Sequence, residues 1–253
     1  MNLFFQDKVV LVTGGSTGIG AAIAKGFGAA GAKVAVHYLT NEEKANQVVS
    51  SIKEMGADAI SVRADMTSAS DVKNLYSVIL QHYGRVDILI NNAGSMVERC
   101  PFENLSEEVW DQVYNINVKS IFLSTKEAVP IMKKQGGGVV INTASVAARN
   151  GGGPGAIHYA SAKGAVMTLT KGLAKELLPY HIRVNGINPG VISTPFHEKF
   201  SPDKVRDQFL KGIPMGREGT PEEIAGAVLF LASDYASYIC GEHIEINGGQ
   251  WMD

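Results

Sequence analysis

The chain of 253 residues has few cysteines, little net charge and no long apolar run. Its two cysteines, Cys100 and Cys240, are too few for a disulfide framework and are typical of a reducing compartment. Lysine and arginine (23) nearly balance aspartate and glutamate (25), so the net charge of −2 gives no electrostatic reason to expect nucleic acid or an anionic membrane as a partner. No apolar run approaches the roughly 18 residues of a spanning helix, and the first residues lack the pattern of a signal peptide. We therefore expect a soluble, cytoplasmic protein.

Short apolar runs alternate with helical patterns along the chain, of which 45% is hydrophobic. Strands are predicted at 9–12, 33–38, 59–65, 86–90, 139–141, 182–187 and 243–246. Helices are predicted at 21–30, 41–55, 69–83 and 106–134, and from 157 and 220 onward. This α/β alternation requires a parallel sheet covered by helices on both faces, and right-handed crossovers make it doubly wound. Because no linker or internal repeat interrupts it, residues 1–253 are expected to form a single domain.

The first strand is followed directly by a glycine-rich turn, Thr13-Gly-Gly-Ser-Thr-Gly-Ile-Gly20, and then by a helix. Glycines let the backbone approach a pyrophosphate, and a helix N-terminus directs N–H groups and the positive end of its dipole toward it. The spacing of Gly14, Gly18 and Gly20 differs from the common G-x-G-x-x-G pattern. Taken alone, the turn predicts either a dinucleotide site or a turn that only packs its helix closely.

A serine, a tyrosine and a lysine are placed so that they can act together. Ser145 lies just past the carboxyl end of the strand at 139–141, and Tyr159 and Lys163 are one turn apart on a helix. The ammonium group is expected to lower the pKa of the phenol, which ordinarily titrates near ~10, and the serine hydroxyl is expected to hold a carbonyl oxygen. The spacing indicates a carbonyl-reduction site. The alternative for the pair is a half-buried tyrosine beside a solvated lysine.

Six motifs occur in the order and approximate spacing of the short-chain dehydrogenase/reductase family, which the chain resembles over essentially its whole length. They are Thr13-Gly-x-x-x-Gly-Ile-Gly20, Asn91-Asn-Ala-Gly94, Asn117, Ser145, Tyr159-x-x-x-Lys163 and Asn188-Pro-Gly190. The resemblance implies a Rossmann-like fold and an NAD(P)-dependent oxidoreductase that interconverts a carbonyl and an alcohol. It also implies a homotetramer, and no metal is expected. The distant alternative is a non-catalytic dinucleotide-binding regulator, which the presence of Tyr159 and Lys163 disfavours.

The resemblance implies four catalytic residues. Tyr159 would be the general acid in reduction and the general base in oxidation. Lys163 would lower its pKa and bind the nicotinamide ribose, while Ser145 would position the substrate oxygen. Asn117, rather than nearby Asn115, would bind the water that links the lysine to a proton relay. A compatible alternative is an asparagine that interrupts its helix to satisfy a backbone group.

The resemblance also implies which residues bind the dinucleotide. Asn91 would secure the adenosine side of the pocket and the neighbouring strands, and Asp65 would contact the adenine, although a solvated turn aspartate is the alternative. Thr194 would hold the nicotinamide carboxamide, and Gly190 would relieve crowding near the ring. The full set is Gly14, Ser16, Thr17, Gly18, Ile19, Gly20, Tyr38, Asp65, Met66, Asn91, Ala93, Gly94, Tyr159, Lys163, Pro189, Gly190, Ile192 and Thr194.

The end of the second strand bears on the choice between NAD and NADP. An acidic residue there would bind the ribose 2′-OH of NAD and repel the 2′-phosphate of NADP. Here the strand ends in His37-Tyr38, with Tyr38 at the position of the acid and no carboxylate before Glu42. The glycine turn carries Ser16-Thr17 where many NADP-dependent relatives have arginine. We expect NADP(H) to be favoured over NAD(H).

The substrate is predicted from a narrower likeness, to the reductases of 4-deoxy-5-hexoseulose uronate. The likeness lies in residues 91–99, 151–156, 194–197, 212–217 and 247–250. It predicts a small polar or acidic sugar-derived substrate, with Arg99 and Arg149 at its carboxylate. His197 and Gln250 are expected to bind its hydroxyls. The structural alternatives are a surface charge for Arg99, a loop cation for Arg149, a polar residue at a helix start for His197, and a C-terminal or interface group for Gln250.

Two further features bear on the substrate. The chain resembles 3-oxoacyl-thioester reductases more generally, and reduction of a 3-oxoacyl group on acyl carrier protein is the alternative function. That function requires a basic patch beside the site, whereas the pair Lys133-Lys134 is expected at a helix end, where the dipole favours it. Residues 193–217, which include many charges, are expected to form a substrate lid.

Overall fold

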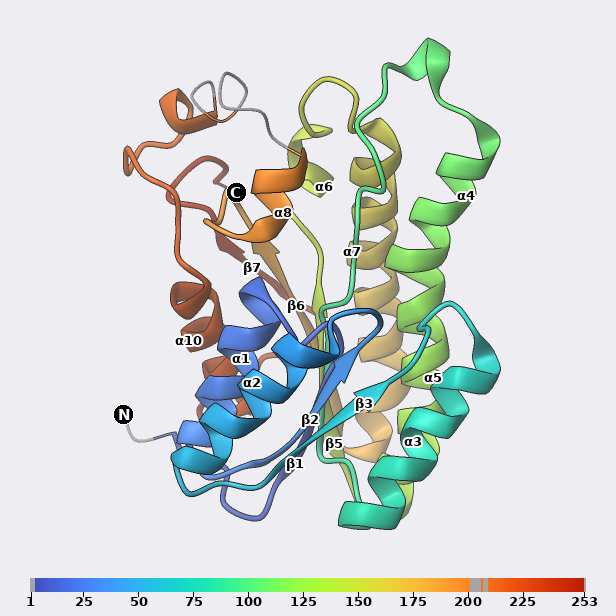
Figure 1. Cartoon of the computed structure of the whole chain (residues 1–253), viewed down its shortest axis with the longest axis vertical. Helices are drawn as coiled ribbons and strands as arrows, with labels where there is room; N and C mark the ends of the chain where they lie inside the picture. Colours follow the sequence, from blue (N-terminus) through green and yellow to red (C-terminus); the bar gives the residue numbers. More distant parts are fainter. Residues whose placement is uncertain (1–2, 201–205, 207–208, 253) are drawn as a thin grey trace.

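The computed structural model describes residues 3–200, 206 and 209–252, which contain one seven-stranded parallel sheet (Figure 1). The strands are β1 (Val9–Val12), β2 (Lys33–Tyr38), β3 (Ala59–Arg63), β4 (Ile88–Asn91), β5 (Gly138–Thr143), β6 (Ile182–Pro189) and β7 (His243–Ile246). Their order across the sheet is β3-β2-β1-β4-β5-β6-β7. The chain therefore runs outward from β1 to one edge and then restarts beside β1 with β4. The doubly wound parallel sheet predicted from the alternation is confirmed.

Helices cover both faces because successive strand residues point to opposite sides of the sheet. The longer helices are α1 (Gly18–Ala29), α2 (Glu42–Glu54), α3 (Ala69–Tyr83), α4 (Glu107–Tyr114), α5 (Ser120–Lys134), α7 (Ile157–Leu177) and α10 (Pro221–Ala232), and the shorter ones are α6 (Ala147–Asn150) and α8 (Pro195–Phe200). Val10 and Val12 of β1 pack with α1, α2 and α10. Val9 and Leu11 pack on the other face with α3, α5 and α7. Figure 1 shows these two sets of helices on opposite sides of the strands.

Side chains at the starts of α10, α3 and α4 pair with free backbone N–H groups, the last through Ser106 and the N–H of Val109. The Thr220 hydroxyl accepts the N–H of Glu223, and the Glu223 carboxylate accepts the N–H of Thr220, with Pro221 in the first turn of α10. This reciprocal pair is a capping box, at the helix start predicted at residue 220. At the start of α3, the Ser68 hydroxyl accepts the N–H of Asp71.

The helical region predicted at 106–134 is interrupted in its middle. α4 ends at Tyr114, a π-helical segment spans Asn115–Lys119, and α5 begins at Ser120. Within that segment, Asn117 Nδ2 donates to the Val113 carbonyl and so takes part in the helix's own hydrogen bonding. Wide helical turns of this kind are rare and often mark functional sites.

The lid expected at 193–217 lies only partly within the described residues. Pro195–Phe200 form α8, and Ile192 pairs with Gly219 in a parallel bridge. Residues 201–205, 207 and 208 lie outside the described part of the chain. Among the helices that are described, none is long and apolar enough to cross a membrane.

Candidate active site

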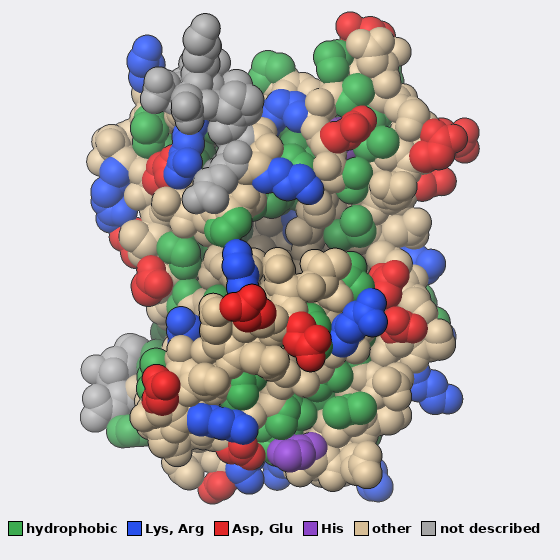
Figure 2. Space-filling view, viewed as in Figure 1, with side chains coloured by type: hydrophobic (Ala, Val, Ile, Leu, Met, Phe, Trp, Pro, Cys, Tyr) green, Lys and Arg blue, Asp and Glu red, His purple; other side chains and the backbone are tan. Residues whose placement is uncertain are grey.

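A cavity of about 780 Å³ lies at the carboxyl ends of the central strands. It is centred where the strand order reverses between β1 and β4, the place at which open parallel sheets bind ligands. The glycine turn after β1 and the segments after β2 and β3 line one end, and Ser145, Tyr159 and Lys163 line the other. Figure 2 shows a recess near the middle of the molecular face in view.

The glycine turn has the backbone geometry of an anion cradle. Gly14 and Gly18 have φ values of 63° and 52°, in the left-handed region that favours glycine. A Cβ on Gly20 would lie 2.2 Å from the Gly14 carbonyl oxygen, so the turn closes only around a glycine. The N-cap Thr17 makes no side-chain hydrogen bond to the first turn of α1. These features fit a pyrophosphate held by backbone N–H groups.

Two polar side chains that were not predicted hold this turn in place. His37 is buried at the end of β2, where its Nδ1 accepts the N–H of Gly14 at 2.9 Å and its Nε2 donates to the Ala64 carbonyl at 3.0 Å. These partners place the proton on Nε2, and burial lowers the pKa of His37, so the ring is neutral. Asn92 Nδ2 donates to the carbonyls of Thr13 and Gly14 at 3.0 and 3.2 Å. The sequence offered one signal for His37: a histidine in an otherwise apolar strand indicates a buried polar group that needs hydrogen-bond partners.

All the residues expected to bind the dinucleotide line the cavity except Asn91. Asn91 is buried behind the wall, where its Nδ2 donates to Thr125 Oγ1 at 3.2 Å and to Asn142 Oδ1 at 2.9 Å. It therefore ties β4 to β5 and α5, as the family resemblance implied, and it does not line the cavity. Asp65 lines the cavity while its Oδ1 accepts the N–H of Thr67 at 2.8 Å, so the turn role and the cavity position coexist.

Ser145, Tyr159 and Lys163 meet at the other end of the cavity. Tyr159 and Lys163 are one turn apart on α7, and Lys163 Nζ lies 5.6 Å from the centre of the Tyr159 ring. Ser145, just after β5, is hydrogen-bonded to the tyrosine hydroxyl, and its Oγ accepts the N–H of Ala147 at 3.1 Å. Lys163 Nζ donates to the Thr143 carbonyl at 2.7 Å. The three side chains predicted to act together are therefore brought together.

Burial dominates the protonation of this group. It raises the pKa of Tyr159 to about 12, and the hydrogen bond with Ser145 offsets only part of that shift. Burial also lowers the pKa of Lys163 to about 7. The expected lowering of the tyrosine pKa by the lysine is therefore not found in the protein alone: Lys163 is not among the groups that shift the pKa of Tyr159, and burial favours its own neutral amine form. Tyr159 is a protonated acid at neutral pH, which is the form that reduction requires.

Asn117 is completely buried, and only part of its amide is paired. Its Nδ2 donates to the carbonyls of Ser95 (2.6 Å) and Val113 (2.8 Å), whereas its Oδ1 has no hydrogen-bond partner among the described residues. A Cβ on Gly94 would lie 2.7 Å from that Oδ1 and 3.2 Å from Lys163 Nζ. The amide oxygen and the lysine amine therefore face the same small space beside Gly94.

The residues expected at the substrate do not all lie together. Arg99 and Gln250 line the cavity. Arg99 Nε and Nη1 donate to the carbonyls of Phe200 (3.0 Å) and Pro154 (2.5 Å), and burial lowers the pKa of the guanidinium. Gln250 Oε1 is buried and has no partner in the described part of the chain. The side chain of His197 lies outside the described residues.

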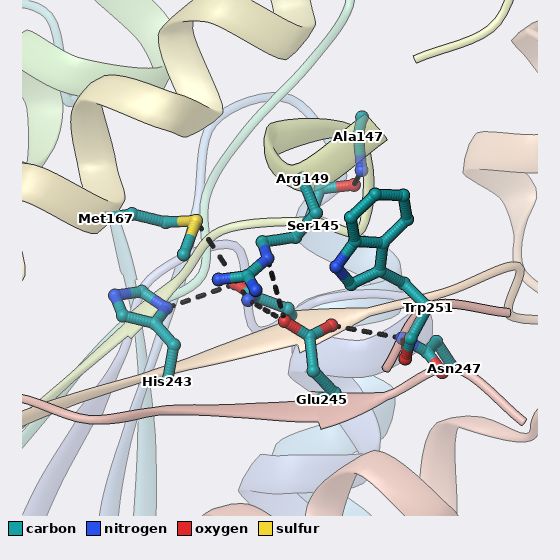
Figure 3. Close-up of polar contacts among 9 residues, drawn as sticks. Ser145, Ala147, Arg149, Met167, His243, Glu245, Asn247 and Trp251 are labelled. Carbon is teal, nitrogen blue, oxygen red and sulfur yellow. Dashed lines mark hydrogen bonds and ion pairs between the residues drawn. The ribbon is translucent and has the colours of Figure 1, made fainter. Parts of the chain in front are cut away.

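Arg149, the second arginine expected at the substrate carboxylate, does not line the cavity. It pairs instead with Glu245 on β7, with 3.6 Å between Nε and Oε1 (Figure 3). Glu245 also accepts from Asn188 Nδ2 at 2.6 Å and from Asn247 Nδ2 at 3.0 Å. Figure 3 shows this network beside the Ser145 segment. Arg149 is thus paired with the carboxylate of Glu245 rather than directed toward a substrate. The network joins α6 to the edge of the sheet.

The fold and this site define a class of oxidoreductases. A family model described as Enoyl-(Acyl carrier protein) reductase matches residues 14–250. The chain belongs to the short-chain dehydrogenase/reductase family, whose members are NAD(P)-dependent oxidoreductases. The family predicted from the six motifs is confirmed.

Individual relatives match over nearly the full chain. The 3-oxoacyl-[acyl-carrier-protein] reductase FabG of Staphylococcus aureus is 39% identical over 247 residues, which cover 98% of this chain and 99% of that protein. A solved 7α-hydroxysteroid dehydrogenase, complexed with NADH and 7-oxo glycochenodeoxycholic acid, matches with a TM-score of 0.93 and 36% identity over 100% of this chain and 98% of its own. The 3-ketoacyl-(acyl-carrier-protein) reductase of Brucella melitensis, complexed with NADH, matches with a TM-score of 0.91 and 35% identity over 98% and 99%.

Proposed function

We propose that the protein reduces the 3-oxo group of an acyl thioester to a hydroxyl group, with a nicotinamide dinucleotide as hydride donor. The observation that carries the proposal is the 39% identity to a 3-oxoacyl-[acyl-carrier-protein] reductase over 98% of the chain. Part of the cavity wall near Tyr159 is apolar: Met96 packs in the same cluster as the tyrosine, and the Phe196 ring lies 5.6 Å from the tyrosine ring, centre to centre. Such a wall suits a short acyl chain.

The side chains at this end of the cavity supply the proton of the reaction. The dinucleotide, when bound along the glycine turn, supplies a hydride to the carbonyl carbon. Ser145 donates its hydroxyl hydrogen to the carbonyl oxygen and so places that oxygen beside the Tyr159 hydroxyl. As negative charge develops on the oxygen, Tyr159 transfers its proton, which leaves an alcohol and a phenolate. The ammonium form of Lys163 stabilises the phenolate, and the Asn117 Oδ1 beside it is suited to hold a water that returns the proton.

NADP(H) is the favoured dinucleotide in this proposal. Residues 38–41 line the cavity beyond β2 and include no carboxylate. Glu42 does not line the cavity, and its carboxylate is hydrogen-bonded to the Tyr38 hydroxyl. Arg63 Nε donates to the Leu39 carbonyl at 3.2 Å, but this arginine does not line the cavity either. The lack of a carboxylate among residues 38–41 therefore supports NADP(H). Because two solved relatives carry NADH, both dinucleotides have to be compared directly.

A small carbonyl compound that carries a carboxylate, such as a keto sugar acid, is the second candidate substrate. Arg99 is the observation that favours it. The guanidinium lines the cavity, its bonds go to neutral carbonyls, and burial lowers its pKa, so its charge is not compensated by a carboxylate among the described residues. A substrate carboxylate would provide that compensation.

The test is dinucleotide oxidation with acetoacetyl-CoA and with alginate-derived 4-deoxy-5-hexoseulose uronate, each with NADPH and NADH. We expect thioester turnover to dominate and NADPH to give the higher kcat/KM. Tyr159→Phe should lower kcat by about 10²–10⁴ while NADPH still binds. Arg99→Met should leave thioester reduction within about threefold. Uronate turnover that depends on Arg99, with little thioester turnover, would replace the main proposal by the second candidate.

We also propose a homotetramer of single-domain subunits that works in the cytoplasm, as family membership implies. The exposed Phe122 on α5 and Met252 near the chain end are apolar groups that subunit contacts would cover. Sedimentation should give a mass near four times 27.0 kDa and unfolding should occur in one transition. A monomeric mass at micromolar concentration would contradict the assembly.

A further inference from the structure

The loop that follows β4 forms a wall of the cavity without having regular secondary structure. Residues 94–100 are neither helix nor strand. Ser95, Met96 and Arg99 of this loop line the cavity on the side of Tyr159. The shape of the substrate end therefore depends on contacts that hold the loop from outside.

His158, the residue before the catalytic tyrosine on α7, makes two of those contacts. Its side chain is completely buried, and its Nε2 lies 3.1 Å from the Met96 carbonyl oxygen and 3.0 Å from that of Glu98. Two carbonyl oxygens can only accept, so Nε2 carries the proton and donates to both. Nδ1 is buried and has no partner among the described residues. His158 is therefore a fixed donor that holds two carbonyls of the loop.

The residue between the two carbonyls has a strained backbone. Val97 has φ of 65°, in the left-handed region that a β-branched residue rarely adopts. Its N–H donates to Ser95 Oγ at 3.0 Å. A strained conformation persists only where surrounding contacts over-determine it. The N–H of Glu98 donates to the Met96 carbonyl at 2.8 Å and closes a tight turn around Val97. His158 binds the carbonyls of residues 96 and 98, on both sides of Val97, and so ties this turn to α7.

The loop transmits its position to other parts of the cavity wall. Arg99 extends from it to the carbonyl of Phe200 on α8 and to that of Pro154. The N–H of Cys100 donates to the Gly155 carbonyl at 3.0 Å. A shift of residues 95–99 would therefore move the arginine and loosen its contacts with both neighbouring segments.

We infer that His158 is a positioning residue for the carbonyl substrate: it holds the strained loop 95–99 against the helix that carries Tyr159. It does not touch the reacting atoms, because both Nε2 contacts go to backbone carbonyls and the side chain does not line the cavity. Its effect is on substrate binding, while the proton donor and the dinucleotide end of the cavity stay in place. The kinetic part of this inference rests on the carbonyl reduction proposed above.

The test compares His158→Leu, which has no donor, with His158→Gln, whose amide can donate to both carbonyls. In the leucine variant, amide hydrogen exchange of residues 95–100 should be about tenfold faster or more, since the Glu98 carbonyl loses its donor and the Met96 carbonyl keeps only the N–H of Glu98. The KM for acetoacetyl-CoA should rise about tenfold, with kcat and the Kd of NADPH within about twofold. The glutamine variant should resemble the wild type in all of these.

A second variant tests the strain directly. Val97→Gly removes the Cβ that opposes the positive φ, and Val97 itself does not line the cavity. Added to His158→Leu, it should recover part of the lost KM and slow the loop's exchange, while alone it should leave KM unchanged. Unchanged exchange in His158→Leu, or no rescue by His158→Gln, would overturn the inference. If the wild type does not reduce the thioester, the proposed function fails, while the exchange comparison still decides the role of His158.

Discussion

Replacing Lys163 with methionine should remove a pH dependence of stability that the catalytic site imposes on the fold. The lysine is only 2% exposed, and burial lowers its pKa from 10.5 to about 7. Between these values the unfolded chain holds the proton while the folded chain has released it. Because the unfolded state then binds more protons, the free energy of unfolding rises with pH from about 7 toward 10.5. Below pH 7 both states are protonated and the contribution is constant.

The magnitude follows from the same two pKa values. One pKa unit corresponds to about 1.4 kcal/mol. Integrating the difference in bound protons from pH 7 to pH 9 adds about 2 kcal/mol to the free energy of unfolding of the wild type. Three buried or half-buried tyrosines do not disturb this window, since desolvation raises the pKa values of Tyr76, Tyr83 and Tyr159 and they titrate at higher pH. Methionine has a similar length and no titrating group, so the variant should change by less than about 0.5 kcal/mol.

The measurement is urea unfolding followed by circular dichroism at pH 7, 8 and 9, at one protein concentration and without dinucleotide. The wild type should become more stable across the series, and Lys163→Met should not. Lys163→Arg serves as a control, because arginine stays protonated and should also remove the rise while keeping a positive charge. An equal rise in the wild type and the methionine variant would show that other groups cause it. A flat wild type would show that the lysine is solvated in the folded protein.

Three further predictions concern packing, capping and the network beside the serine segment. Gly94→Ala should lower kcat by about 10² or more, since the new Cβ would lie 2.7 Å from the buried Oδ1 of Asn117. The control is Gly172→Ala on α7, where the space around the glycine is open. This control should raise the free energy of unfolding by about 0.5–1 kcal/mol and leave kcat unchanged. Thr220→Ala should lower the free energy of unfolding by about 1 kcal/mol in urea titrations because α10 loses its cap, and unchanged stability would refute that role of the hydroxyl. A double-mutant cycle with Arg149→Met and Glu245→Gln should give a coupling energy of about 0.5–1 kcal/mol in thermal unfolding, and strictly additive losses would mean that the ion pair contributes nothing.

Much of the architecture was predictable because it depends on local pattern. Strands buried on both faces appear as continuous apolar runs, and helices between them appear as periodic ones, so the doubly wound sheet followed from the chain alone. Spacing of four on a helix brings Tyr159 and Lys163 to one face wherever that helix packs. The glycine turn located the dinucleotide end of the cavity for the same reason, since its close backbone approach is a local property.

The tertiary structure alone decided how these groups behave. The direction in which the pKa of Tyr159 shifts depends on how completely water is excluded from its hydroxyl, and residue spacing does not determine this. Arg149 pairs with Glu245, which is distant in the chain, because β7 closes the sheet beside α6. His158 holds the strained loop at Val97 because α7 packs against the loop that follows β4. Each of these outcomes is set by which remote segments meet and how much solvent remains between them, and local sequence constrains neither.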